Sequence, residues 1–339
     1  MDRPGDRRRV IFWARSRGHE IVTDLSQKVD VIVASEKADF SSRIFQESKT
    51  PIAFDLIDAY LCQTNQLEDF ARGISKRLDK QIGSGLHSFT TYLKDFCKKS
   101  NVVICSSPEQ EEIIREINKN TRVILDSHDE IPFRNVGTKL NLVNESVKSI
   151  LWEGQSTTIP GLRFVSPALK IISQDNNLKV SFITDKNYYL VLGKYFRRRT
   201  FNLIQRHSNL NPDQIFINSW SPENLTNQAA RSHLAIIPTD LSIPLIRLKP
   251  ENRLLIMWRL GLPCLTSASP AYKRVANYVG VDSICETSIE WRLKMQQLLD
   301  DPELARIQAV KGQAYIRDHH TGPFLLKKWD EAIELAMSC

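Results

Sequence analysis

The chain has 339 residues, 42% hydrophobic and 25% charged, a composition typical of a folded protein with two domains rather than of a disordered or fibrous chain. No apolar stretch approaches the roughly 20 residues that span a bilayer, and no apolar segment follows the charged N-terminus, so we expect a cytoplasmic protein. The net charge of +7 would suit a nucleic acid, an acidic membrane surface or phosphorylated substrates. No helix-turn-helix, zinc finger or aromatic-basic RNA-binding motif is present, and we expect no nucleic-acid partner.

The first half of the chain alternates short β-branched and apolar runs with helical stretches. Strands are predicted at 10–13, 20–22, 29–33, 51–55, 101–105 and 122–125. The clearest helices are predicted at 67–99 and 108–117. Because continuous apolar strands are typical of a parallel sheet that helices cover on both faces, we predict a Rossmann-like first domain over residues 1–140.

The second half repeats this pattern after a polar stretch at 135–148, which we interpret as a hinge. Strands are predicted at 149–152, 178–183, 214–217, 233–237, 263–266 and 283–285. We predict a second Rossmann-like domain over residues 141–321, with a ligand at the carboxyl ends of the strands, in the cleft between the domains. The motif G-x-G-x-x-G and a P-loop are both absent, and the first absence argues against a nicotinamide enzyme.

The last segment, 322–339, is predicted to form a helix. Its apolar residues Leu326, Trp329, Ile333 and Met337 recur every three or four positions, so they share one face. That face could pack on the first domain or within the second, and the pattern allows both.

The six cysteines are scattered without a C-x-x-C pair. This spacing argues against a zinc ribbon and against a thioredoxin-like motif. We expect reduced thiols, with Cys105 and Cys264 in the core because they stand at the ends of predicted strands.

The most informative segment is a predicted helix of about three turns at 250–261, which begins with proline and ends at glycine. Its amino end follows the strand at 233–237. Free N–H groups at a helix start bind anions, and Lys249 and Arg253 can both flank this end, so a diphosphate would fit there. The alternative is an ordinary capped helix on the surface.

The run 249–255, followed by 260–263, resembles the donor-binding helix of GT-B glycosyltransferases of the group-1, family-4-like set. Other segments agree with that family in order and spacing. Residues 149–154 resemble the first strand of its second domain with a glycine loop, 235–240 resemble the strand before the donor helix, and 51–58 resemble an acceptor-domain strand ending in acidic residues.

This resemblance implies an α/β fold of two Rossmann-like, doubly wound domains that face each other across a cleft, the GT-B fold. It implies a glycosyltransferase, such as a hexosyltransferase of polysaccharide biosynthesis. Such an enzyme moves a sugar from a nucleotide-sugar to a glycan, lipid-linked or other acceptor, with retention of configuration. It also implies that the last helix crosses back to the first domain. No metal and no cofactor besides the donor are expected, since GT-B enzymes generally use protein cations instead.

One departure concerns the E-x7-E signature of the family. Its two glutamates would fall on Leu248 and Ile256, and Glu251 is the nearest carboxylate. The donor is therefore bound in an altered way, or donor binding has been lost. Two alternatives stay open: a non-catalytic binding or scaffold subunit, and a sugar-nucleotide epimerase of the same fold, which needs several carboxylates in the cleft.

The chemistry of glycosyl transfer selects candidate residues on both sides of the expected cleft. Cationic and N–H groups must meet the charge that develops on the leaving diphosphate. The donor-side candidates are Gly154, Lys249, Glu251, Asn252 and Arg253. For a base near the acceptor hydroxyl the candidates are Asp58, Asp129 and His19, each of which could instead be a helix cap, a loop acid or a turn residue.

Basic residues gather around the first predicted strand, at 7–9, Arg15 and Arg17, and on the helix before the strand at 101–105. Cations there would attract an anionic acceptor, or hold the protein at the inner face of an anionic membrane. The alternative is a solvated basic surface.

Overall fold

The computed structural model describes residues 4–338 apart from 25–26, 39–44, 46, 48, 63–68, 70–72, 75–87, 137–145, 176 and 192–194. Most of the predicted hinge, and most of the predicted helix at 67–99 ahead of Phe89, lie outside the described residues. The chain divides into two units. Unit 1 contains Met1–Ser127, Leu248–Pro250 and Thr321–Cys339, and unit 2 contains His128–Arg247 and Glu251–His320.

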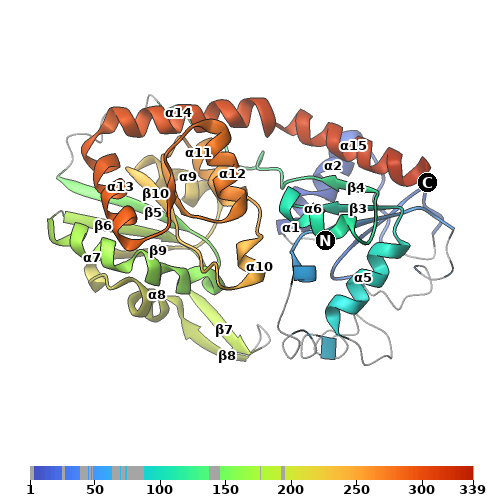
Figure 1. Cartoon of the computed structure of the whole chain (residues 1–339), viewed down its shortest axis with the longest axis horizontal. Coiled ribbons are helices and arrows are strands. Elements are labelled where there is room, and N and C mark those ends of the chain that lie inside the picture. Colours follow the sequence, from blue (N-terminus) through green and yellow to red (C-terminus); the bar gives the residue numbers. More distant parts are fainter. Residues whose placement is uncertain are drawn as a thin grey trace. The chain divides into compact units, whose positions relative to one another are not determined.

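Unit 1 is built on a parallel sheet of four strands (Figure 1). In sheet order these are β1 (Ile32–Ser35), β2 (Ile52–Leu56), β3 (Val102–Cys105) and β4 (Thr121–Val123). Every residue of β2 and β3 is buried, as their continuous apolar runs predict for strands covered on both faces.

Alternate strand residues of unit 1 pack against different helices. Phe54 and Val103 join the core of α5 (Phe89–Lys99) and α6 (Pro108–Arg115) on one face. Ala53 and Ile104 join the core of α2 (Val10–Arg17) and α15 (Gly322–Ser338) on the other. A short helix α1 (Pro4–Arg8) and a 3-10 turn η1 (Tyr60–Cys62) complete the described elements of this unit.

Two strand predictions near the N-terminus are wrong. Residues 10–13 begin helix α2, and residues 20–22 form no strand. A run of four apolar residues cannot be told from a buried helical segment by periodicity, and here tertiary packing decides. Trp13 stacks on Trp329 of α15 at 6.1 Å between ring centroids, and Gly18, with φ of 72°, ends the helix.

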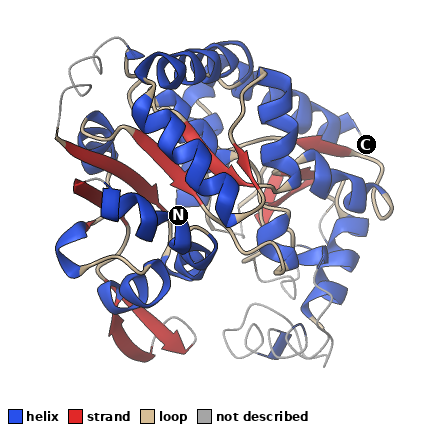
Figure 2. Ribbon diagram, turned by 60° about the vertical axis from the view of Figure 1, so that its left-hand side comes forward, coloured by secondary structure: helices blue, strands red, loops and turns tan. Residues whose placement is uncertain are grey.

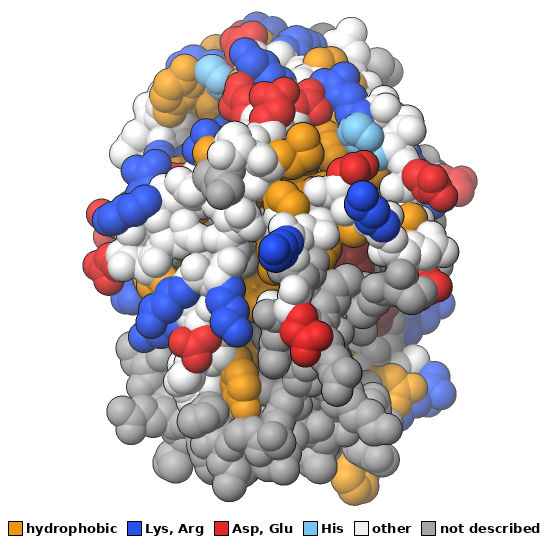
Figure 3. Space-filling view, turned by 90° about the vertical axis from the view of Figure 1, so that its right-hand side faces the viewer, with side chains coloured by type: hydrophobic (Ala, Val, Ile, Leu, Met, Phe, Trp, Pro, Cys, Tyr) orange, Lys and Arg blue, Asp and Glu red, His pale blue; other side chains and the backbone are white. Residues whose placement is uncertain are grey.

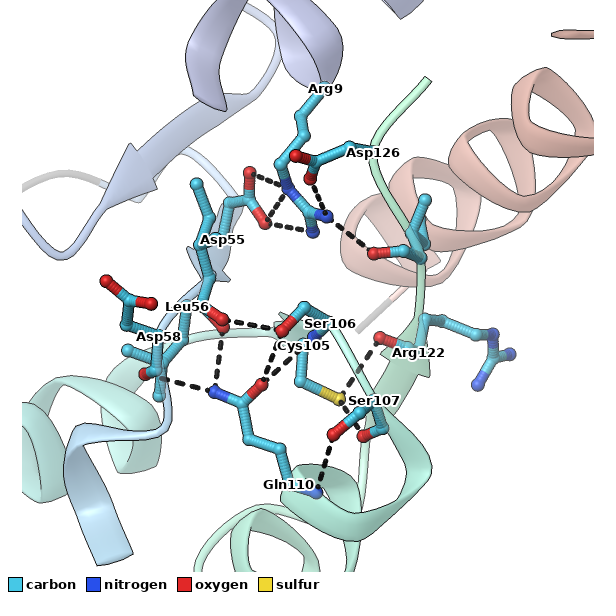
Figure 4. A network of polar contacts seen from close by, with 12 residues as sticks. Arg9, Asp55, Leu56, Asp58, Cys105, Ser106, Ser107, Gln110, Arg122 and Asp126 are labelled. Atoms are coloured by element: carbon cyan, nitrogen blue, oxygen red, sulfur yellow. Dashed lines mark hydrogen bonds and ion pairs between the residues drawn. The ribbon is translucent and has the colours of Figure 1, made fainter. Parts of the chain in front are cut away.

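Arg9, the residue before α2, is fully buried and connects several elements of unit 1 (Figure 4). Its Nε and Nη2 donate hydrogen bonds to the Asp55 carboxylate of β2 at 2.6 to 3.0 Å. Its Nη1 donates to the Ile124 carbonyl oxygen at 2.5 Å and to Asp126 at 3.4 Å, both just beyond β4. One guanidinium therefore ties α2 to the carboxyl ends of two strands.

Unit 2 is built on a parallel sheet of six strands with helices on both of its faces (Figure 2). In sheet order the strands are β12 (Ile284–Cys285), β11 (Cys264–Ser267), β10 (Leu234–Ile237), β5 (Val147–Glu153), β6 (Asn177–Ile183) and β9 (Ile215–Asn218). The six strands predicted in the second half are confirmed. The antiparallel hairpin of β7 (Asn187–Val191) and β8 (Tyr195–Arg199) was not predicted.

The described helices of unit 2 alternate with its strands. The α-helices are α7 (Ser166–Asp175), α8 (Thr200–Ser208), α9 (Pro222–Ala230), α10 (Pro244–Arg247), α11 (Asn252–Arg259), α12 (Pro270–Val279), α13 (Ser288–Asp300) and α14 (Pro302–His319). The 3-10 segments are η3 (Ser156–Phe164) and η4 (Pro212–Gln214). None of the described helices combines the length and apolar composition needed to cross a bilayer. Cys105 and Cys264 are buried free thiols, as predicted.

Residues 128–136 group with unit 2, although the sequence placed them in the first domain. The Arg134 N–H donates to the Arg259 carbonyl oxygen at 3.1 Å, and Arg259 Nε donates to the Ile131 carbonyl oxygen at 2.5 Å. Gln313 of α14 donates to the Arg134 carbonyl oxygen at 2.5 Å. Hydrogen bonds to α11 and α14 therefore hold this segment. The hydrophobic pattern of the sequence does not predict such hydrogen bonds.

Replacing Arg9 by methionine leaves the buried Asp55 carboxylate and the partly buried Asp126 carboxylate without their cation. We expect the free energy of unfolding to fall by about 3 to 5 kcal/mol, measured by urea denaturation. The control is Arg17→Ala, because the side chains of the Arg17–Asp330 pair are 41% and 31% exposed and such pairs contribute at most about 1 kcal/mol. The double variant Arg9→Met/Asp55→Leu should lose less than Arg9→Met. Equal losses for Arg9→Met and Arg17→Ala would contradict this account.

Candidate functional site

The order of strands in unit 2 reverses at its centre, between β5 and β10. The chain adds β6 and β9 on one side of β5 and then returns to place β10, β11 and β12 on the other. In doubly wound sheets ligands bind outside the carboxyl ends of the strands at this reversal. Residues 153–154 at the end of β5 and 238–240 after β10 lie at this position.

Arg253, in the first turn of α11, reaches the carboxyl end of β5. Its Nε lies 3.4 Å from Glu153 Oε2, and its guanidinium carbon lies 5.2 Å from the centre of the Trp152 ring. A Cβ built on Gly154 would lie 3.0 Å from Arg253 Nη2, so a glycine allows the loop to approach this closely. The structure thus brings together Arg253 and Gly154, two of the predicted donor-side residues.

The guanidinium of Arg253 retains unused hydrogen-bonding capacity. Its Nε and Nη2 are buried and have no hydrogen-bond partner among the described residues, since the contact with Glu153 lacks hydrogen-bond geometry. Asn252 Oδ1 and Thr239 Oγ1 are also buried and have no hydrogen-bond partner among the described residues. Buried polar groups without partners are rare in folded proteins and point to a bound ligand or water.

A hollow lies beside the end of β10 in unit 2. Its lining residues are Thr157, Thr158, Pro160, Gly161, Thr239, Asp240, Ile243 and Ile246. Asp240 in its wall is paired with Arg163 at 2.6 Å. Hydroxyls, an ion pair and two isoleucines here could contact a polar ligand that has an apolar face.

The other two donor-side candidates already have partners. Glu251 is 2% exposed, and its two oxygens accept hydrogen bonds from Arg274 at 3.2 and 3.1 Å. Lys249 groups with unit 1, where its Nζ lies 3.7 Å from Asp58 Oδ1. Ile256, at the position of the second glutamate of the family signature, is 3% exposed.

Asp58 follows β2 at the carboxyl edge of the unit 1 sheet, and a polar network fixes its backbone (Figure 4). Gln110 Nε2 donates to the carbonyl oxygens of Leu56 at 2.9 Å and of Asp58 at 3.2 Å, and Ser106 Oγ donates to the Ile57 carbonyl oxygen at 2.6 Å. The Asp58 side chain is 32% exposed. The backbone that carries this carboxylate is therefore held in place, and the carboxylate is open to a ligand.

The structure does not group the other two base candidates with Asp58. The His19 ring packs on Trp13 at 4.5 Å between centroids, just past the end of α2. Asp129 groups with unit 2, not with unit 1, and accepts a hydrogen bond from Arg259 Nη2 at 3.2 Å.

Glu36 is a candidate that the sequence analysis missed. It follows β1 at the same edge of the sheet as Asp58, is 3% exposed, and its Oε2 has no hydrogen-bond partner among the described residues. Burial, supported by the negative charge of Asp58, raises the pKa of Glu36. The signal available in the sequence was the one that selected Asp58, an acidic residue just after a predicted strand.

The basic residues near the N-terminus do not form one continuous surface. Arg9 is buried against Asp55, and Arg17 is paired with Asp330 at 2.5 Å. On the face shown in Figure 3, acidic and basic side chains are interspersed. The interpretation of 7–9 as a cationic surface is therefore wrong for Arg9.

No protein-family model matches this chain, and no curated protein resembles it in sequence. Solved structures match it in fold. Sucrose-phosphate synthase from Thermosynechococcus elongatus is 12% identical, with a TM-score of 0.62 over 97% of this chain and 76% of that one. TarM is 13% identical, with a TM-score of 0.59 over 89% of this chain and 54% of that one. The pneumococcal O-GlcNAc transferase GtfA, in complex with UDP and GlcNAc, is 12% identical, with a TM-score of 0.56 over 91% and 57%.

These identities show the fold alone, and the chain spans about half the length of TarM and of GtfA. The chain has the GT-B fold, an α/β architecture with two Rossmann-like domains, as predicted.

The raised pKa of Glu36 predicts a pH-dependent stability. Because the folded protein holds this proton more tightly than the unfolded chain, the contribution of Glu36 is present below the ordinary carboxyl pKa and is lost as the pH rises through the raised value. Glu36→Gln stays neutral, so we expect it to be more stable than the parent at about pH 8 and similar at about pH 4. Urea denaturation across this range measures the difference. Glu112→Gln, at an exposed position of α6, is the control, and parallel curves for Glu36→Gln and the parent would refute the assignment.

Proposed function

We propose that the chain is a glycosyltransferase that moves a sugar from a nucleotide-sugar donor to a glycan or lipid-linked acceptor, and that unit 2 binds the donor. The observation that carries this proposal is the pair of buried Arg253 N–H groups without a hydrogen-bond partner, at the reversal of strand order in a GT-B fold. A cation beside the start of a helix is the arrangement that binds a diphosphate.

Arg253 would act on the leaving group. When the bond from the sugar to the diphosphate breaks, negative charge grows on the phosphate oxygens, and fixed donors in a site shielded from water stabilise it. Contact with Trp152 and Glu153 holds the guanidinium in place before the donor arrives. The glycine at 154 lets the backbone approach the same anion.

The acceptor side is assigned to unit 1. Asp58 is the proposed base for the acceptor hydroxyl, because Gln110 holds its backbone, its side chain is partly exposed and it stands at a strand end. Retention of configuration is carried over from the family-4-like resemblance. GtfA is described with UDP, so UDP and UDP-sugars are the first ligands to test.

A second candidate function is nucleotide binding without sugar transfer. The observation that favours it is Ile256, a buried aliphatic side chain where the family places the glutamate that contacts the ribose. The two functions differ in one measurable respect, since a binding subunit retains affinity for a nucleoside diphosphate and does not turn the donor over. An epimerase would convert the sugar of the donor without any acceptor.

Arg253→Ala should weaken UDP binding by roughly 10-fold to 150-fold, the effect of losing a charged hydrogen bond of about 1.5 to 3 kcal/mol. Isothermal titration measures the Kd. The control is Arg231→Ala, at an exposed arginine after α9 in the same unit, which should leave the Kd unchanged. An unaltered Kd for UDP in Arg253→Ala would contradict the assignment of the diphosphate to this site.

Asp58→Asn should leave the Kd for UDP unchanged and lower the rate of transfer by about 100-fold or more, because the proposed base would no longer accept the proton. Product formation from a UDP-sugar panel, followed by mass spectrometry, measures the rate. A parent protein that binds UDP and consumes no donor would favour the binding function instead.

A further inference from the structure

The hairpin of β7 and β8 stands apart from the six-stranded sheet of unit 2. It is inserted between β6 and α8, and Figure 1 shows it extending away from that sheet. Tyr189 lies opposite Arg197, and Tyr188 lies opposite Arg198. Because opposite residues of an antiparallel pair share a face and neighbours alternate, each face of the ribbon carries an aromatic ring beside an arginine.

Several of the described side chains of this hairpin are exposed. Phe196 is 70% exposed and Tyr189 is 48% exposed. Arg197, Arg198 and Arg199 are all exposed, and none of them forms an ion pair with a described residue. Three adjacent cations without counter-charges, next to apolar rings, form a surface that attracts an anionic partner with an apolar layer.

The backbone at Phe196 supports a role for the exposed ring. Its φ of 56° lies in the left-handed region, which costs a bulky residue about 1 kcal/mol or more. A two-stranded ribbon is also only marginally stable in water without a surface to cover it. Strain and exposure together are not explained by packing within unit 2.

We propose that the hairpin of β7 and β8 docks on an anionic phospholipid surface. Arginines near such a surface are drawn to the lipid headgroups, and aromatic rings settle at the boundary between headgroups and acyl chains. The inference does not depend on the proposed sugar transfer.

A lipid surface explains the two-sided character of the ribbon better than a nucleic acid does. Proteins that bind single strands use a groove that follows the phosphate backbone, and a ribbon in a duplex groove turns one face to the bases. Here both faces carry arginine and aromatic side chains. A ribbon immersed among headgroups meets the same surroundings on both faces.

Co-sedimentation of the full chain with vesicles tests the proposal. Vesicles of phosphatidylcholine with about 30% phosphatidylglycerol should bind the protein, and pure phosphatidylcholine should bind it far less. The triple variant Arg197→Ser/Arg198→Ser/Arg199→Ser should lower the partition coefficient on the order of 100-fold, since each arginine contributes about fivefold. Phe196→Ser should lower the binding that persists at high salt, where charge attraction is screened.

The matched control removes three cations elsewhere. Lys119→Ser/Lys170→Ser/Lys327→Ser changes the net charge equally at exposed positions outside the hairpin, and it should change the partition coefficient by no more than a few fold. Arg197→Lys/Arg198→Lys/Arg199→Lys keeps the charge and should keep most of the binding. Melting curves verify that each variant is folded, and single substitutions at 197 and 198 replace the triple variant if it is not.

Three outcomes would overturn the proposal. The first is no binding of the parent to anionic vesicles at low salt. The second is an equal loss in the arginine and lysine triple variants, which would show attraction by net charge alone. The third is hairpin-dependent binding of single-stranded or duplex oligonucleotides, measured by fluorescence polarisation, without binding to vesicles.

Discussion

Close packing between α11 and α14 fixes the position of the candidate site in unit 2. A Cβ built on Gly312 of α14 would lie 2.3 Å from Trp258 of α11, so only a glycine lets the two helices approach this closely. Residues 254–258 are all buried, which leaves α11 no freedom to turn about its axis. The direction of Arg253, one residue earlier, follows from this packing.

The same packing accounts for the departure from the family signature. A glutamate at Ile256 would lie in an apolar interior, where an unpaired carboxylate is costly or stays protonated. The carboxylate nearest in sequence, Glu251, is already neutralised by Arg274. Buried polar atoms without a hydrogen-bond partner among the described residues belong instead to Arg253, Asn252 and Thr239. The buried polar atoms without partners therefore lie at the start of α11 and at the end of β10.

Sequence patterns located the parallel strands well, because fully buried strands leave continuous apolar runs such as 101–105. They misread 10–13, where an equally apolar run is a helix held by Trp329, a residue distant in sequence. Arg253 and Gly154, which the structure places side by side, were selected through the resemblance and through helix-end chemistry. The burial of Arg9 was not predicted, since it depends on contacts between distant segments that no local pattern encodes. Glu36 was missed although, like Asp58, it follows a predicted strand.

The position of α15 at the end of the chain delays the folding of unit 1 during translation. Leu325, Trp329 and Ala332 of α15 fill the face of the unit 1 sheet that carries Ala53 and Ile104, so the first unit to leave the ribosome lacks part of its core. Roughly 190 residues of unit 2 separate the two parts, which takes about 10 to 40 seconds to translate. During that interval the sheet of unit 1 exposes an apolar face, and a chaperone would bind to that face.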